Sequence, residues 1–257
     1  MLTLLSPSKT QDDSDQPANR RYGSPTTPAF LSDAVALAET LRRKSPDELA
    51  ELMHISEDLA MLNHARYQRF APPFTIDNAR PALLTFRGDV YTDITVDTYS
   101  SADFIFAQQH LRILSGFYGL LRPLDLMQPY RLEMGTPLPT ERGANLYRFW
   151  GNRLTERLNE TLAEQENPVV INLASQEYFK AIDSKRLSAP VITPTFKEYK
   201  NGQFRTVAIY AKRARGKMAN FIVEHRINAP DRLKTFNEDR YEYHEADSTE
   251  QRWVFVR

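Results

Sequence analysis

The chain has 257 residues, of which 41% are hydrophobic and 26% charged, and its formal net charge at pH 7 is zero. Such a composition is typical of a globular protein with a sizeable core, and it argues against a polyanion-binding tail or a generally basic surface, although a local basic cleft fits it. Because the chain has no cysteine, a disulfide, a thiolate metal site and a cysteine nucleophile are all excluded.

The N-terminal segment Met1–Leu5 predicts a buried strand, and Ser8, Lys9 and Thr10 follow shortly after it. Small polar residues and a lysine after a strand often contact a ligand, although a core strand with a solvated turn explains the same pattern. The glycines of a phosphate-binding P-loop are absent. The following stretch, Gln11–Pro28, predicts an exposed loop in which limited proteolysis should cut first.

Three helices are expected next. The first is Phe30–Arg43, the second starts at Ser45 with a capping box to Glu48, and the third runs from Ser56 to the Pro72-Pro73 stop. Pro81–Phe86 predicts a second strand, which runs into Arg87, Gly88 and Asp89. Asp89 is either a catalytic carboxylate or, as the simpler interpretation, the ion-pair partner of Arg87.

The most informative stretch is Leu111–Gly135. Phe104, Ala107, Leu111 and Leu114 recur at helical spacing, Gly116 is a plausible stop, and a second apolar segment runs from Gly119 to Pro123. This pattern predicts a hairpin between two helices, with Arg112, Arg122 and Arg131 beside it. Its backbone N–H groups and these arginines suit a phosphate, while the simpler interpretation is that Gly116 and Gly119 let two helices pack closely.

In the second half, Asn145–Glu164 predicts an amphipathic helix and Pro168–Leu173 a strand buried on both faces. Ser175 then suits a helix cap, since the glycines of a serine-nucleophile elbow are missing. Val191–Glu198 and Gln203–Tyr210 predict a β-hairpin around Asn201-Gly202. A second hairpin is expected near the C-terminus, with Tyr241 and Tyr243 in one strand and Trp253–Val256 in the other.

A basic cluster follows the predicted strand Gln203–Tyr210 and opens the next helix. Such a cluster is usually a solvated helix face, but its position at a strand-to-helix junction favours an anion site. Its members are Lys212, Arg213, Arg215 and Lys217.

The remaining signals concern metals and membranes. The five histidines contain no His-x-x-x-His pair, so we expect no metal ligands and no cofactor. No apolar run approaches the roughly 20 residues of a membrane span, and the apolar N-terminus lacks the basic start of a signal peptide. We therefore expect no membrane partner and a cytoplasmic location.

Five stretches together resemble the YaaA family of bacterial peroxide-stress proteins: LSPSKT (5–10), FRGDVY (86–91), LSGFYGLLRPLDLMQPYRLEMG (114–135), INLASQEYFK (171–180) and YAKRARGKMANFI (210–222). The resemblance covers nearly the whole chain. It implies a single α/β domain over residues 1–257, of the "cantaloupe-like" fold, with a central mixed sheet flanked by helices, a helix-hairpin-helix element and a positively charged cleft. It also implies a role in limiting free iron during hydrogen peroxide stress, and binding of double-stranded DNA.

Two functions follow as expectations. The first is binding of the DNA phosphate backbone by the basic cleft, which would help to limit iron-driven oxidative damage. The candidate residues are Lys9, Arg87, Arg112, Gly116, Gly119, Arg122, Arg131, Lys180, Lys212, Arg213, Arg215 and Lys217. The alternative is an enzyme acting on a small phosphate- or carboxylate-bearing substrate in the same cleft, with Asp89, Asp125, Glu133 or Glu177 as acid or base.

Overall fold

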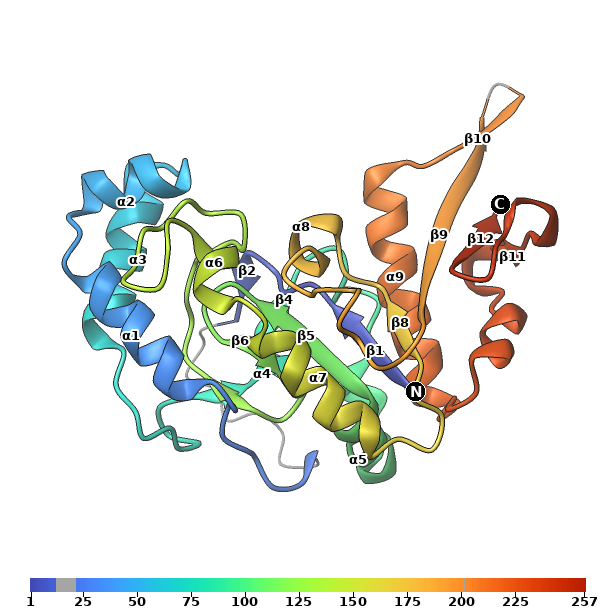
Figure 1. Cartoon of the computed structure of the whole chain (residues 1–257), viewed down its shortest axis with the longest axis horizontal. Coiled ribbons are helices and arrows are strands. Elements are labelled where there is room, and N and C mark those ends of the chain that lie inside the picture. Colours follow the sequence, from blue (N-terminus) through green and yellow to red (C-terminus); the bar gives the residue numbers. More distant parts are fainter. Residues whose placement is uncertain (13–21, 201) are drawn as a thin grey trace.

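The computed structural model describes residues 1–12, 22–200 and 202–257, and its centre is a mixed sheet (Figure 1). Within these residues the sheet has eight strands: β1 (Leu2–Leu5), β5 (Leu111–Ser115), β6 (Gly119–Leu121), β8 (Val170–Asn172), β9 (Val191–Lys200), β10 (Gln203–Arg205), β11 (Glu242–Tyr243) and β12 (Arg252–Val256). Their order is β11-β12-β9-β8-β1-β5-β6, and β10 pairs with β9. The predicted mixed α/β fold is therefore confirmed.

The middle of the sheet is parallel and its margins are antiparallel. β1 pairs in parallel with β5 and with β8, and β9 pairs in parallel with β8 and β12. All residues of β1, β5 and β8 are buried, as expected of parallel strands that are covered on both faces. The strands predicted at Met1–Leu5 and Pro168–Leu173 are thus confirmed, as is the C-terminal hairpin of β11 and β12.

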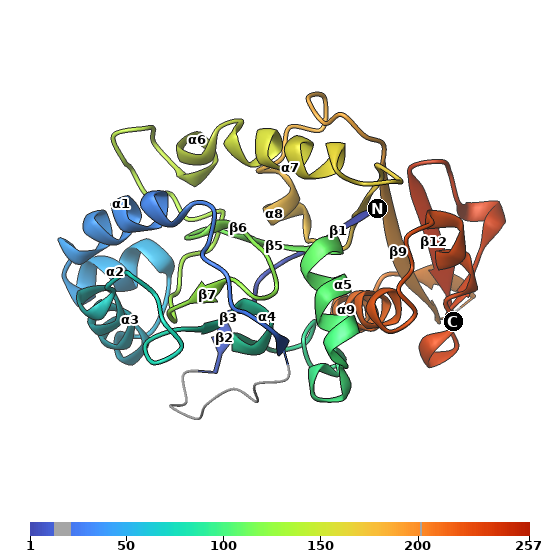
Figure 2. The same ribbon diagram turned by 90° about the horizontal axis from the view of Figure 1, so that it is seen from below.

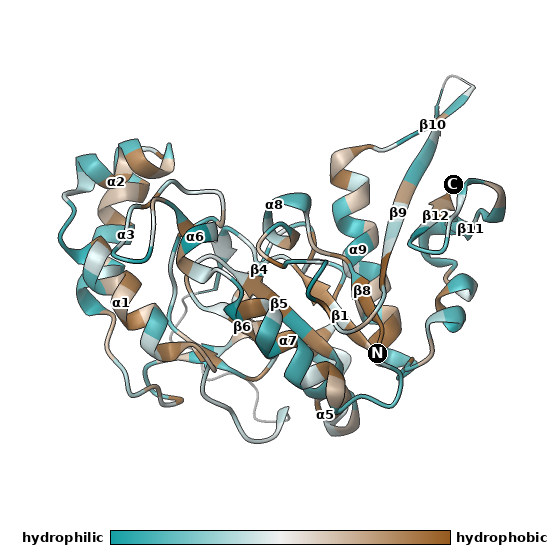
Figure 3. Ribbon diagram, in the orientation of Figure 1, coloured by the Kyte–Doolittle hydropathy of each residue, from teal (hydrophilic) through white to brown (hydrophobic). Residues whose placement is uncertain are grey.

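Helices cover both faces of this sheet. Figure 2 shows α7 (Arg153–Ala163) on one face, and α5 (Ser101–His110) and α9 (Ala208–Glu224) on the other. Apolar residues are concentrated in the central strands (Figure 3). The buried residues form one hydrophobic cluster that extends from Met1 to Phe255.

The helices α1 (Leu31–Arg42), α2 (Pro46–Met53) and α3 (Glu57–Arg69) lie together at one end of the molecule (Figure 1). The capping box at the start of α2 is confirmed, because Ser45 and Glu48 each accept the backbone N–H of the other. The shorter elements are β2 (Thr10–Gln11), β3 (Arg80–Pro81), α4 (Ala82–Thr85), β4 (Phe86–Arg87), β7 (Leu126–Met127), α6 (Leu146–Trp150) and α8 (Gln176–Phe179).

The segment from Leu111 to Leu121 is a β-hairpin, so the helix-hairpin-helix predicted there is wrong. α5 starts after its Ser100 cap and ends at His110. β5 follows at once and is buried at every position, beside β1. A strand buried on both faces is rich in apolar residues, so Leu111 and Leu114 of β5 continue the helical spacing of α5 by coincidence.

Three further element predictions need correction. Pro81–Phe86 is not one strand, because its two ends pair with different partners, β7 and β2, and Ala82–Thr85 between them is helical. The helix predicted at Asn145–Glu164 is broken into α6 and α7 at Gly151, which has a φ of +53°. In the β9–β10 hairpin the second strand stops at Arg205, and α9 already begins at Ala208.

Two predicted features fall partly outside the described residues. These are Asn201 in the turn of the β9–β10 hairpin and residues 13–21 of the loop predicted at Gln11–Pro28.

Candidate functional site

A cavity of about 490 Å³ opens where β1 and β8 end side by side. The next strand of this sheet after β1 is β5, which lies on one side of the β1–β8 pair. The next strand after β8 is β9, which lies on the other side of that pair. The carboxyl ends of two such strands border a natural crevice, because their connections leave in opposite directions. The lining residues are Ser6, Pro7, Ser8, Lys9, Thr10, Gln11, Gly88, Asp89, Val90, Tyr130, Arg131, Leu132, Glu133, Leu173, Ser175, Glu177, Tyr178, Lys212 and Arg215.

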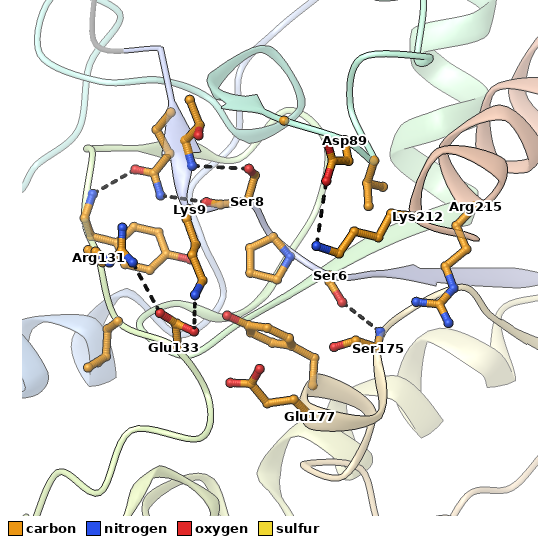
Figure 4. Close-up of a pocket in the computed structure, with 18 of the residues that line it drawn as sticks. Ser6, Ser8, Lys9, Asp89, Arg131, Glu133, Ser175, Glu177, Lys212 and Arg215 are labelled. Atoms are coloured by element: carbon orange, nitrogen blue, oxygen red, sulfur yellow. Dashed lines mark hydrogen bonds and ion pairs between the residues drawn. The ribbon is translucent and has the colours of Figure 1, made fainter. Parts of the chain in front are cut away.

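The basic cluster of α9 is divided between two faces of the helix. Lys212 and Arg215 are three residues apart and line the cavity (Figure 4). Arg213 and Lys217 are four apart and bind Asp93 outside the cavity, at 2.9 Å and 3.4 Å. The prediction that the cluster lies at a strand-to-helix junction is wrong, because it lies within the first ten residues of α9. Helical periodicity therefore decides which of its cations can reach a ligand.

Gly216 places α9 against the loop that carries Asp89. A Cβ built on Gly216 would lie 1.9 Å from the carbonyl oxygen of Val90, so no other residue fits without a shift of the backbone. This close approach brings Lys212 to within 3.7 Å of Asp89 at the cavity wall. Gly216 could not be recognised from the sequence, since a glycine within a helix has no local signature of the tertiary contact that requires it.

Arg215 differs from the other cations of the cavity because it is not neutralised. Its side chain is half-buried, and no hydrogen bond or ion pair joins it to any residue in the described parts of the chain. Burial lowers the pKa of this guanidinium, although a guanidinium stays charged at neutral pH. In Figure 4 it reaches from α9 towards Ser175.

The opposite side of the cavity holds a paired group of charges. The carboxylate of Glu133 forms ion pairs with Lys9 at 2.8 Å and with Arg131 at 3.6 Å. Glu177 lies below them in Figure 4 and accepts the backbone N–H of Gly135 at 2.9 Å. The two sides of the cavity therefore differ in formal charge: Lys9, Arg131, Glu133 and Glu177 balance on one side, while Lys212, Asp89 and Arg215 on the other leave one positive charge.

Hydroxyl groups form part of the cavity wall. Ser6 follows β1 and its Oγ accepts the backbone N–H of Ser175 at 2.8 Å, which ties the start of α8 to the end of β1. Ser175 occupies the cap position of α8, as predicted, but its side chain makes no capping hydrogen bond. Burial raises the pKa of Tyr130 and of Tyr178, so both phenols keep their protons. Ser6 and the two tyrosines were not singled out from the sequence, because a serine after a strand and a buried tyrosine are common.

Four of the predicted DNA- and anion-binding residues line the cavity: Lys9, Arg131, Lys212 and Arg215. Of the predicted acid–base candidates, Asp89, Glu133 and Glu177 are there as well. Asp125 is not, since it is fully buried and accepts the Thr26 hydroxyl and the Arg122 guanidinium.

The structure places the other predicted residues away from the cavity lining. Arg87 pairs with Asp12 at 2.9 Å, and Lys180 lies over the ring of Tyr147. Arg112 is buried and donates to two backbone carbonyl groups, those of Gln108 and Leu111.

The two hairpin glycines have packing roles. Gly119 has a φ of +70°, and a Cβ on it would lie 2.7 Å from the ring of Trp150. A Cβ on Gly116 would lie 2.4 Å from the carbonyl oxygen of Leu132. Both positions are buried, so the simpler interpretation of this hairpin, close packing, accounts for them.

The described residues contain neither a group of three or more potential metal-ligating side chains nor a helix long and apolar enough to cross a membrane.

The fold and its cavity define a class: an α/β protein with a cavity of small-molecule size at a switch point of a mixed sheet. The family model described as peroxide stress protein YaaA matches residues 1–247. The chain is also 51% identical over 257 residues to a UPF0246 protein of Cellvibrio japonicus (strain Ueda107), covering 100% of this chain and 98% of that protein. The chain belongs to the YaaA family of peroxide stress proteins.

Proposed function

We propose that this peroxide stress protein binds a small phosphate- or carboxylate-bearing substrate in the cavity and acts on it as an enzyme. The observation that carries this proposal is Arg215, a half-buried guanidinium on the cavity wall that has no partner among the described residues. A buried cation without a counter-charge is unfavourable, and an anion that binds it recovers that cost.

The size of the site supports a small ligand. At about 490 Å³, the cavity falls within the range of roughly 300 to 1,000 Å³ that is common for small-molecule sites. Arg215 presents a planar fork of N–H donors that suits two oxygens of a phosphate or carboxylate.

Carboxylates at the same cavity supply groups for proton transfer. Asp89 and Glu177 reach it from different elements, the loop before α5 and the helix α8. Either can act as a general acid or base if a bound substrate places a proton within hydrogen-bond distance. The reaction class thus proposed is proton-transfer chemistry on an anchored anion.

The test compares two arginines of the same helix. Arg215→Gln removes the charge inside the cavity, while Arg213→Gln removes a charge from the outer face of α9. Titration with inorganic phosphate, followed by protein NMR, should show affinity reduced at least ten-fold by Arg215→Gln, because charged hydrogen bonds contribute about 1.5 to 3 kcal/mol. Arg213→Gln should bind phosphate as the wild type does. Equal affinities of the wild type and Arg215→Gln would refute the proposal.

A second candidate is binding of double-stranded DNA at the rim of the cavity, which would help to limit iron-driven damage to that DNA. The exposed side chains of Lys9 and Lys212, at 60% and 56% exposure, support it. Their ion pairs with Glu133 and Asp89 weigh against it, because each pair offsets the charge that a DNA phosphate would meet. The small cavity is therefore the stronger proposal.

Salt dependence tests the DNA candidate. If each lysine contacts one phosphate, Lys9→Gln and Lys212→Gln should each lower the slope of log affinity against log salt by about 0.9 for a duplex. Fluorescence anisotropy with a labelled duplex measures this slope. Unchanged slopes in both variants would exclude the rim as the DNA contact.

A further inference from the structure

Among the described residues that line the cavity, one charge of each sign has no ion-pair partner in the described parts of the chain. Arg215 is the unpaired cation, and Glu177 is the unpaired anion: no ion pair joins Glu177 to any cation in the residues described. Glu133 differs from it, since Lys9 and Arg131 both bind that carboxylate. A ligand with a single negative charge would satisfy Arg215 and leave Glu177 without a counter-charge.

Glu177 is held firmly in place. Its Oε1 accepts the N–H of Gly135 at 2.9 Å, and its backbone carbonyl accepts the hydroxyl of Tyr147 at 3.0 Å. The start of its helix is tied to β1 through Ser6 and Ser175. Since Gly135 occupies only one carboxylate oxygen, the other is available to a group in the cavity.

The cavity wall near these charges combines apolar side chains with the hydroxyl groups of Ser6 and Ser175. Leu173 and Tyr178 are both buried and contribute to it, together with Pro7. In Figure 4, Arg215 and Glu177 lie on different sides of Ser6 and Ser175. Two opposite charges that are separated along a wall with apolar side chains suit a ligand whose charged groups are separated by a short carbon chain.

We infer that the ligand of this cavity is a zwitterion, with a phosphate or carboxylate bound by Arg215 and an ammonium group bound by Glu177. This inference rests on the proposed function, since it assigns the second half of the same substrate. Such a ligand neutralises both unpaired charges at once, and an anion without an amine neutralises only one.

The experiment uses the full chain and three matched series of phosphate monoesters. Each series has chains of two to five carbons, and the chain ends in an ammonium, a hydroxyl or a methyl group. We expect one aminoalkyl phosphate to bind at least ten-fold more tightly than its hydroxyalkyl and alkyl counterparts. In Glu177→Gln that advantage should disappear while alkyl phosphate binding stays the same. Glutamine keeps an oxygen for the N–H of Gly135, so the local fold is preserved.

The outcomes separate the two proposals. If alkyl phosphates and inorganic phosphate bind but the ammonium group adds nothing, or hydroxyl serves as well, the zwitterion inference is overturned and the anion site stands. The inference also fails if Glu177→Gln retains the preference for the amine. If neither inorganic phosphate nor any ester binds, the proposed function fails together with it.

Discussion

The basic cluster of α9 and the hairpin from Leu111 to Arg122 have similar sequence signals but different surroundings. Both combine glycine with arginine beside an apolar segment, and both were candidates for a phosphate. In the hairpin, Arg112 donates to carbonyl groups of the fold and Arg122 pairs with the buried Asp125. On α9, Arg215 has no such partner among the described residues.

An arginine is therefore available to a ligand only where the folded chain has not already supplied hydrogen-bond acceptors for its guanidinium. A guanidinium that is satisfied by carbonyl groups gains little from a phosphate, because it must first give up existing hydrogen bonds. Sequence proximity to glycine does not distinguish the two situations. The variants below either sharpen or contradict this distinction.

The largest effect is expected for Gly216→Ala. Alanine normally stabilises a helix by up to about 1 kcal/mol relative to glycine, yet here its Cβ would meet the carbonyl oxygen of Val90 at 1.9 Å. We expect a net loss of about 3 kcal/mol in the free energy of unfolding, as in strongly overpacked sites. Phosphate affinity should fall as well, because α9 must move and carries Arg215 with it. Urea denaturation and phosphate titration measure the two effects, and a stabilised variant would contradict this account of α9.

Gly119→Ala should destabilise the protein by about 2 kcal/mol without weakening the anion site. Its φ of +70° and the ring of Trp150 at 2.7 Å both oppose a Cβ. The hairpin nevertheless lies outside the cavity lining. Phosphate titration well below the melting temperature of the variant should match the wild type. A loss of affinity in the folded fraction would restore the hairpin as a phosphate-contacting turn.

The parts of the site that depend on the local sequence could be predicted. β1 and β8 are apolar at nearly every position, so they could be recognised as central strands, and the polar residues after them line the cavity. Lys212 and Arg215 were found for the same reason, as cations near the start of a helix.

The rest depends on contacts between distant segments. The contact between Gly216 and Val90 joins residues 126 positions apart, and nothing in either segment alone indicates it. The end of α5 was misplaced because β5 gains its stability from pairing with β1, which overrides the local helical pattern. Likewise, only the folded structure shows that backbone carbonyl groups accept the hydrogen bonds of the Arg112 guanidinium.

Arg122→Gln removes a positive charge from the hairpin, and it should change the free energy of unfolding but not the phosphate affinity. Asp125 loses its ion pair but keeps the Thr26 hydroxyl and the backbone N–H of residue 122. We expect a loss of about 1 kcal/mol, because the Arg122 side chain is partly exposed and solvent screens the pair. Phosphate affinity should not change. A ten-fold loss of affinity would show that this arginine also serves the anion site.

The smallest effect is expected for Asp93→Asn, and it appears only in acid. Hydrogen bonds from the Arg213 guanidinium lower the pKa of Asp93 below its usual 3.8, and the Lys217 ammonium adds to this while burial opposes it. Since the folded state has the lower pKa, the unfolded state takes up a proton first as the pH falls. The carboxylate therefore contributes its full stability above about pH 4 and loses it below that pH, as the pH falls through the pKa of the folded state.

Asp93→Asn should accordingly lower the free energy of unfolding slightly at neutral pH, and its difference from the wild type should shrink as the pH falls below about 4. Urea denaturation from pH 3 to pH 7 measures the difference. The variant also frees Arg213 on the outer face of α9, while Lys217 keeps its ion pair with Asp239 at 3.4 Å. At physiological salt, charges outside the cavity are screened over about 8 Å. Phosphate affinity should thus stay within two-fold of the wild type. A larger gain would mean that both faces of α9 contribute to the anion site, and the contrast between Arg215 and its neighbours would no longer hold.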